Sequence, residues 1–149
     1  MSEWELLLRV FVAALLGGLV GWDREAANKP AGIRTHMLVA LGAALFAGSS
    51  ILILGEAWQT DGRGDAVRIP AAIVTGVGFL GAGAIMRSDG RVFGMTTAAG
   101  IWVVAAIGLL VGSGFWILGV GATVLVLLIV NTSSLFGSAA DEGSAEPQS

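Results

Sequence analysis

The 149-residue sequence contains no cysteine, no tyrosine and a single histidine, His36. Without cysteine the chain can form no disulfide, thiolate metal site or cysteine nucleophile. Charged residues make up 13% of the chain, whereas a soluble domain carries about 25%. The net charge is −3 and no run of basic residues occurs, so the sequence offers no electrostatic surface for nucleic acid. These shortages argue against a soluble globular domain and against a nucleic-acid partner.

Apolar residues dominate instead, at 55% of the chain, with a mean hydropathy of +0.83. A membrane-spanning helix needs about 20 mostly apolar residues, with a range of about 17–25. Five segments approach this length: 6–22, 35–55, 69–86, 96–111 and 115–130. Only a Gly-Ser-Gly turn separates the last two, which predicts a tight helical hairpin; the alternative makes 96–111 a half-helix that does not cross. We therefore expect an all-α polytopic membrane domain over residues 1–130, a compact bundle of about five transmembrane helices.

The two ends of the chain differ in character. The first apolar segment follows an acidic start and lacks a small-x-small cleavage site, so we interpret it as a retained helix rather than a signal peptide. Residues 131–149 are rich in Ser, Ala, Gly and acid, which predicts a disordered acidic tail. Lysine and arginine number five in the first and third connections plus the tail, and three on the opposite side. This bias predicts an outside N-terminus and a cytoplasmic C-terminus.

Glycine is abundant, with 23 residues, about twice its ordinary share of roughly 7%. Inside lipid, helices associate through close backbone approach, which small residues at four-residue spacing permit. The glycines expected to pack helices are Gly17, Gly21, Gly76, Gly83, Gly100 and Gly108. The stretch 76–83 leaves two interpretations open, because it fits either a tightly packed helix or a helix that unwinds locally to line a site.

Polar side chains gather near the segment ends on the side predicted to be inner. The cluster comprises Asp23, Arg24, Glu25, Arg34, Thr35, His36, Arg87, Thr96 and Thr97. Ion pairs are expected between Glu25 and Arg34, or between Asp23 and Arg87. The alternative is that these charges only anchor the ends of the spans at the headgroups.

Individual residues of this cluster have predicted roles of their own. Thr35 and Thr96 are candidate helix N-caps. Asp23 and Glu25 are weak candidates for oxygen ligands of Mg²⁺. His36 is interpreted as a hydrogen-bonded interface residue rather than a metal ligand. No carboxylate pair, activated nucleophile or ligand cluster is present, so the sequence predicts no catalytic residue and no cofactor.

Four ordered blocks carry a resemblance to a known family: 17–25 (GGLVGWDRE), 29–46 (KPAGIRTHMLVALGAALF), 73–87 (IVTGVGFLGAGAIMR) and 94–108 (GMTTAAGIWVVAAIG). They resemble the MgtC/SapB family of bacterial inner-membrane proteins, and the likeness covers about residues 6–130. It implies a five-helix inner-membrane domain with a role in magnesium homeostasis and adaptation to low Mg²⁺. Many members continue into a cytoplasmic ACT-like domain after the fifth helix, and this chain resembles the shorter branch without it.

The expected function is therefore that of a non-enzymatic inner-membrane protein linked to magnesium homeostasis that regulates other membrane proteins. The alternative is an oligomeric transporter or channel for Mg²⁺ or another small solute, because five short helices leave one copy little room for a pore. The expected partners are the lipid bilayer and either other membrane proteins or further copies of the chain. A mid-depth free of ionisable groups weakens the case for a pump.

Overall fold

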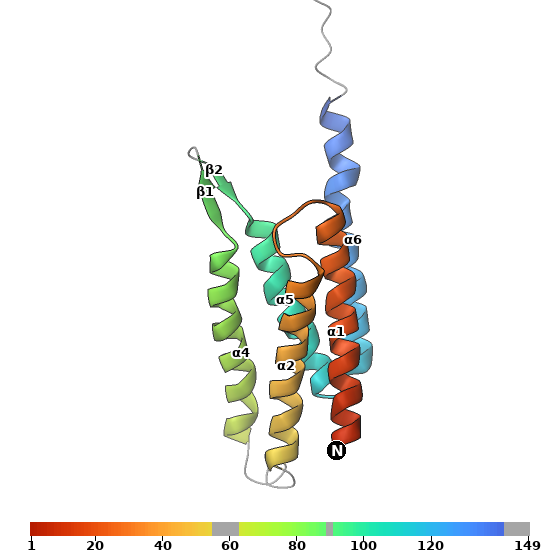
Figure 1. Ribbon diagram of the computed structural model, residues 1–149, viewed down its shortest axis with the longest axis vertical. Helices are drawn as coiled ribbons and strands as arrows, with labels where there is room; N and C mark the ends of the chain where they lie inside the picture. Colours follow the sequence, from red (N-terminus) through yellow and green to blue (C-terminus); the bar gives the residue numbers. More distant parts are fainter. Residues whose placement is uncertain (55–62, 89–90, 142–149) are drawn as a thin grey trace, which may run out of the picture.

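The computed structural model describes residues 1–54, 63–88 and 91–141. Within them, the helices are α1 (Glu3–Ala26), α2 (Ile33–Leu54), α4 (Arg63–Gly83), α5 (Met95–Gly112) and α6 (Trp116–Asp141), and the strands are β1 (Met86–Ser88) and β2 (Arg91–Phe93). The helices run along one common axis, and the strands form a small hairpin beyond α4 and α5 (Figure 1). The predicted all-α bundle of five helices is confirmed for this part of the chain.

The first helix is longer than predicted because both of its ends are well capped. The Ser2 hydroxyl accepts a hydrogen bond from Glu5 N at 3.2 Å. Two glutamates in the first turn interact favourably with the positive end of the helix dipole. At the other end, Asn28 and Ala31 adopt positive φ angles of 53° and 59°. This turn reverses the chain within a few residues, so α2 returns antiparallel to α1.

Two predicted boundaries are wrong. The segment 69–86 predicts a helix that reaches residue 86, but α4 ends at Gly83 and Met86 begins β1. Glycine at the end of α4 contributes to this early stop, because it is about 1 kcal/mol less favourable in a helix than alanine. The tail was expected to be disordered from Asn131 onward, but α6 continues to Asp141. The side chains of Asn131 and Thr132 donate back to helix carbonyls one turn earlier, so these polar residues do not end the helix. Residues 142–149 lie outside the described part of the chain.

The centre of the bundle is formed by α1, α2 and α5, whose backbones come unusually close. A Cβ added to Gly17 of α1 would lie 2.6 Å from the carbonyl oxygen of His36, and one on Gly112 of α5 would lie 2.5 Å from that of Ala44. Gly108 faces the carbonyl group of Ala40 in the same way. The core between these helices consists of small and β-branched side chains, among them Ala13, Ala40, Ala44, Val104, Ile107 and Val111. Side chains this small permit the backbone contact expected in lipid.

The six predicted packing glycines differ in their surroundings, and Gly100 makes only an ordinary contact, since a Cβ there would lie 3.6 Å from His36 Nε2. Gly17, Gly21 and Gly108 lie against the backbone of α2. By contrast, a Cβ on Gly76 or Gly83 of α4 would meet no atom within 4 Å, so these two do not pack another described helix. Their segment is a continuous helix up to Gly83, which decides between the two interpretations of residues 76–83.

The fourth helix lies at the edge of the bundle. In Figure 1 it runs apart from the other helices, and among its described side chains only Gly81 is buried. Gly81 approaches Ala98 of α5 at ordinary van der Waals distance. Over residues 68–83, α4 therefore leaves most of its surface uncovered by the described part of the chain, and its one buried residue is near its C-terminal end.

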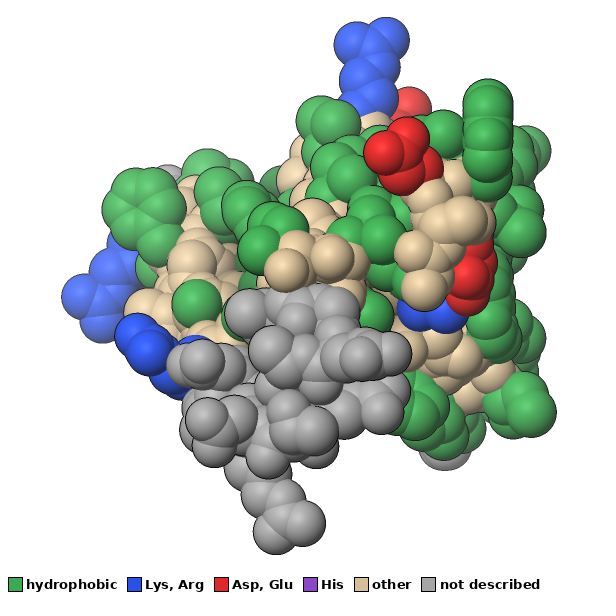
Figure 2. All heavy atoms as spheres, turned by 90° about the horizontal axis from the view of Figure 1, so that it is seen from below, with side chains coloured by type: hydrophobic (Ala, Val, Ile, Leu, Met, Phe, Trp, Pro, Cys, Tyr) green, Lys and Arg blue, Asp and Glu red, His purple; other side chains and the backbone are tan. Residues whose placement is uncertain are grey.

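The outer surface is apolar. Large hydrophobic side chains are strongly exposed on every helix, for example Trp4 (81%), Phe46 (67%), Phe79 (81%) and Ile117 (88%). Figure 2 views the end opposite the hairpin and shows hydrophobic side chains around most of the outline, with charges in few places. In the described residues α1, α2 and α5 are long and apolar enough to cross a membrane, while α4 and α6 carry shorter apolar stretches at 68–83 and 116–132. Apolar surface on this scale is stable in lipid rather than in water.

Candidate functional site

Three polar side chains are buried together at the hairpin end of the bundle, by which we mean residues 24–36 and 84–97. They are Arg24 of α1 (6% exposed), His36 of α2 (0%) and Thr97 of α5 (1%). Arg24 Nη2 donates a hydrogen bond to Thr97 Oγ1 at 3.3 Å, which joins α1 to α5. The sequence predicted these residues as part of one cluster, and the structure brings the three into the interior.

The imidazole of His36 has one occupied and one unoccupied nitrogen. Nδ1 lies 3.0 Å from the carbonyl oxygen of Gly32, one turn earlier on the chain. A carbonyl can only accept, so Nδ1 carries the proton and Nε2 of the neutral ring is left as an acceptor. Among the described residues Nε2 is buried without a hydrogen-bond partner, and a Cβ added to Gly100 of α5 would lie 3.6 Å from it, at ordinary van der Waals distance. The position of His36 agrees with an interface role.

The other members of the predicted cluster lie outside this interior group. Asp23 is half-buried, and the remaining five are exposed: Glu25, Arg34, Thr35, Arg87 and Thr96. The expected Glu25–Arg34 ion pair is wrong, because Glu25 Oε2 instead accepts a hydrogen bond from Ile33 N at 2.9 Å. The predicted Asp23–Arg87 pair is wrong as well, because these two described side chains form no ion pair with each other, whereas Arg9 and Glu5 do.

The two threonines predicted as N-caps do not cap their helices. α2 begins at Ile33, so Thr35 already lies inside its first turn. α5 begins at Met95 after Gly94, which adopts a left-handed φ of 87° and provides no side-chain cap. The backbone turn at Gly94 is forced by the hairpin, because a Cβ there would collide with the carbonyl oxygen of Ala84. As a result, the first amides of α5 receive no side-chain acceptor.

The arrangement offers little to a metal ion. Among the described residues no group of three His, Cys, Asp or Glu side chains lies close enough to hold one. Glu25 already uses one carboxylate oxygen on the backbone of α2. The positive charge of Arg24 follows directly after Asp23 and opposes a cation at this place.

Sequence reasoning missed two polar features. Arg9 is only 12% exposed; its Nη1 donates to the carbonyl oxygen of Gly112 at 2.9 Å, and its Nη2 pairs with Glu5. This cation lies at the C-terminal end of α5, where it complements the helix dipole. The Glu-x-x-x-Arg spacing was the available signal. The second feature is the β1–β2 hairpin, for which the Asp-Gly pair in the sequence between the two strands was the available signal.

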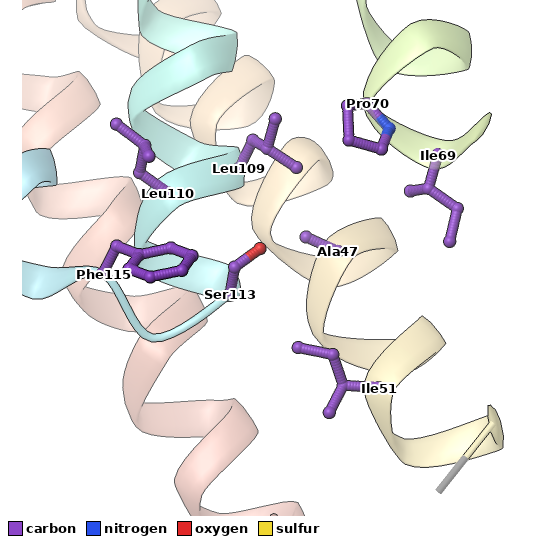
Figure 3. A pocket seen from close by; sticks show the side chains of 8 residues that line it. All are labelled: Ala47, Ile51, Ile69, Pro70, Leu109, Leu110, Ser113 and Phe115. Atoms are coloured by element: carbon purple, nitrogen blue, oxygen red, sulfur yellow. The ribbon is translucent and has the colours of Figure 1, made fainter. Parts of the chain in front are cut away.

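A separate apolar cavity lies between α2, α4 and α5, at about 400 Å³. Figure 3 shows its lining, in which the Ser113 hydroxyl is the one polar group among the labelled side chains of Ala47, Ile51, Ile69, Pro70, Leu109, Leu110, Ser113 and Phe115. One hydroxyl among aliphatic and aromatic groups cannot replace the hydration shell of a cation. The cavity suits an apolar occupant such as a lipid chain.

Known proteins are similar to this chain over most of its length. The family model described as MgtC family matches residues 10–138. "Putative magnesium transporter YhiD" of Escherichia coli strain K12 is 43% identical over 127 residues, which are 85% of this chain and 59% of that protein. "Protein MgtC" of Salmonella typhimurium strain 14028s is 43% identical over 127 residues, 85% of this chain and 52% of that protein.

The Brucella abortus strain 2308 relative, also named "Protein MgtC", is 43% identical over 117 residues, 78% of this chain and 46% of its own length. The chain thus spans about half the length of these curated relatives. No solved structure was found to match it. The matched region contains the three central helices and the buried Arg24, His36 and Thr97, so the relationship covers the fold and its polar site together. This membrane protein belongs to the MgtC family.

Proposed function

We propose that this chain is a non-enzymatic protein of the bacterial inner membrane, linked to magnesium homeostasis, which acts by binding other membrane proteins. Membership of the MgtC family and the magnesium-related name of the Escherichia coli relative support the link to magnesium. The observation that carries the binding role is a groove on the lipid-facing side, between α2 and α4.

The groove has a volume of about 320 Å³ and an apolar lining. Gly42 contributes from α2 and Gly76 from α4, and a Cβ on either would meet no atom within 4 Å. Leu38 and Phe46 border it from α2, at 66% and 67% exposed. In lipid, small residues with open space in front of them permit another helix to approach closely. Other glycines of this chain pack against the backbone of α2, whereas Gly42 and Gly76 face an open groove, which fits contact with a partner.

The outer face of α4 continues this surface. Ala72, Gly76, Phe79 and Gly83 follow a spacing of four, three and four residues, which places them on one side of the helix. All four are exposed, and Phe79 reaches 81%. Small residues flanking one aromatic ring form a surface into which the side chains of a partner helix can pack.

The test is co-purification in mild detergent followed by growth at limiting Mg²⁺. Gly42→Leu and Gly76→Leu fill the groove and are expected to remove the co-purifying membrane protein and the low-Mg²⁺ phenotype. Gly121→Leu of α6 is the matched control, because position 121 is equally open but lies outside the groove. Partner recovery and growth that stay the same in all three variants would contradict the binding role.

The second candidate is an oligomer that transports Mg²⁺ or another small solute, which the name of the Escherichia coli relative favours. Copies of this chain would then meet at the same groove. Native mass spectrometry separates the two proposals, since a homo-oligomer contains only this chain. Reconstitution into liposomes with a magnesium-sensitive dye tests transport directly; absence of flux over a range of gradients would exclude it.

The orientation we propose is an outside N-terminus, with the hairpin end facing the cytoplasm. The lysine and arginine bias of the short connections supports this orientation. The natural absence of cysteine makes the test simple, because each introduced cysteine is the only thiol in the chain. A membrane-impermeant maleimide added to intact spheroplasts should label Ser2→Cys and leave Asn28→Cys unlabelled, and the reverse pattern would overturn the orientation.

A further inference from the structure

A second cavity, distinct from the groove, opens beside the buried Arg24. It has a volume of about 560 Å³ and is lined by residues from the end of α1, the first turn of α5 and the β1–β2 hairpin. Figure 1 shows these three elements at the same end of the bundle. Its polar lining consists of Arg24, Asn28, Lys29, Thr96 and Thr97. Two of these side chains are cationic, and none of the lining residues that the structure describes is acidic. The cavity is therefore a positively charged pocket at the end of a membrane bundle.

The guanidinium group of Arg24 is incompletely paired. Only 6% of the residue is exposed, Nη2 donates to the neutral Thr97 hydroxyl, and Nε is buried without a partner. Guanidinium stays charged at all physiological pH values, and a buried charge is costly unless an opposite charge compensates it. Among the residues that the structure describes, no carboxylate pairs with Arg24. The group that best completes this site is an anion.

The first turn of α5 supplies donors to the same cavity. Its first bond of the regular helix pattern runs from Ala98 N to Gly94 O at 2.9 Å, so the amides of residues 95–97 precede the ladder. Gly94 gives them no side-chain cap, and the first turn contains no acidic residue. Free amides at the positive end of a helix favour an anion. Arg24 and these amides come from different helices and border one cavity.

The residues at the rim of the cavity indicate which kind of molecule bears the anionic group. Met86, Val92, Phe93 and Met95 line it and are 54%, 44%, 50% and 65% exposed. An anion next to exposed apolar side chains, at the end of membrane-spanning helices, matches the head and upper chains of an anionic phospholipid. We propose that this cavity binds a phosphate group through Arg24, Lys29 and the first turn of α5, and that a phospholipid rather than free phosphate supplies it. The proposal does not depend on the groove between α2 and α4.

Native mass spectrometry of the purified protein in neutral detergent tests it, with three probes titrated separately. Dioleoylphosphatidylglycerol carries the phosphate and the chains, dioleoylglycerol carries the chains alone, and inorganic phosphate carries the anion alone. We expect one phosphatidylglycerol bound at least tenfold more tightly than dioleoylglycerol, with inorganic phosphate competing weakly. Equal binding of the two lipids would overturn the phosphate site. Inorganic phosphate as the tighter ligand would overturn the lipid source.

Matched charge removals separate this pocket from general attraction of an anionic lipid to a basic surface. Lys29→Gln removes a lining cation that is exposed, so folding should persist, and we expect a three- to tenfold loss of affinity. Arg34→Gln removes an equal charge at the same end from a position outside the lining, and should change affinity less than twofold. Arg24→Gln should lose more than tenfold where it still folds. Equal losses in Lys29→Gln and Arg34→Gln would contradict the proposal.

Discussion

Replacing Gly108 by alanine tests whether backbone contact between α2 and α5 holds the core together. The new Cβ would lie 2.9 Å from both the Cα and the carbonyl carbon of Ala40, and nearer still to the carbonyl oxygen. Nonbonded carbons are most favourable at about 3.5–4.0 Å. Because the atoms in conflict belong to the backbone, no rotamer change can relieve them, and the two helices must separate by about 0.5–1 Å.

The expected size of the effect follows from two opposing terms. Overpacking of this kind costs about 1–3 kcal/mol. Alanine in place of a helical glycine returns about 0.5–1 kcal/mol through the lower entropy of the unfolded chain. The two terms leave a net loss of up to about 2.5 kcal/mol in the free energy of unfolding, and with both terms at mid-range we expect a loss of about 1 kcal/mol. Gly76→Ala is the matched control, since it makes the same chemical change where no atom lies within 4 Å; it should be equal to or more stable than the wild type.

The measurement is unfolding by SDS in a fixed mild detergent, followed by circular dichroism of the helices. Gly108→Ala should unfold at a lower SDS fraction than the wild type, and Gly76→Ala should not. Coincident transitions for the two variants would refute the reasoning, because they would show that the core tolerates separation of α2 from α5. A loss in Gly76→Ala alone would refute it as well, and would place the critical contacts on α4.

Three further predictions rest on single contacts and use the same assay. Arg9→Gln should lower the free energy of unfolding by about 1–3 kcal/mol, because it removes the charged donor from the carbonyl oxygen of Gly112; wild-type stability would show that water replaces this donor freely. Glu25→Ala should cost about 0.5–1 kcal/mol through loss of the acceptor for Ile33 N, with a weak dependence on salt because salt screens the helix dipole; an unchanged transition would contradict this contact. Gly94→Ala should cost at least about 1–2 kcal/mol, since its φ of 87° disfavours any L side chain, and an unchanged transition would argue against the turn that joins the hairpin to α5.

Hydropathy was sufficient to predict the five helices, because each apolar run is long and is interrupted by turn residues. It could not predict where α6 ends, because the side chains of Asn131 and Thr132 donate hydrogen bonds to carbonyl oxygens one turn earlier and so allow the helix to continue. Nor could it show that α4 stands apart, because glycine spacing is equally present in packed and unpacked helices. The spacing of small residues indicates that a helix can pack closely against another helix. Only the structure shows whether a helix of the same chain packs against that face.

The Glu25–Arg34 pair failed for a different reason. Opposite charges at the ends of neighbouring antiparallel helices suggest an ion pair, yet an exposed pair gains only about 0–1 kcal/mol. The backbone amide of Ile33 lies in the first turn of α2 and has no partner inside the helix. A carboxylate on such an amide gains both a charged hydrogen bond and the favourable end of the helix dipole. The nearer backbone donor therefore outcompetes the side-chain cation.

Helix phase would have separated the buried from the exposed members of the polar cluster. On α1, Arg24 follows Gly17 and Gly21 at a spacing of four and then three residues, so it lies on the packed face, whereas Glu25 is rotated by about 100° onto the surface. On α2, His36 precedes the buried Ala40 by four residues, while the exposed Arg34 and Thr35 are out of phase with it.

The same rule holds on α5, where Thr97 shares its face with Ile101, Val104 and Gly108, and Thr96 does not. One buried polar residue in phase with the small-residue stripe occurs on each of the three central helices, and all three are at the hairpin end. Arg9, which precedes Ala13 of the same stripe on α1 by four residues, lies at the opposite end and is 12% exposed. Tight backbone packing along the rest of each stripe leaves no room for a long side chain, so a buried arginine fits only where the helices end. The polar site and the glycine stripes are thus two parts of a single packing pattern. This pattern, a polar residue in helical phase with the small residues near the end of each central helix, can be looked for in other sequences of the family.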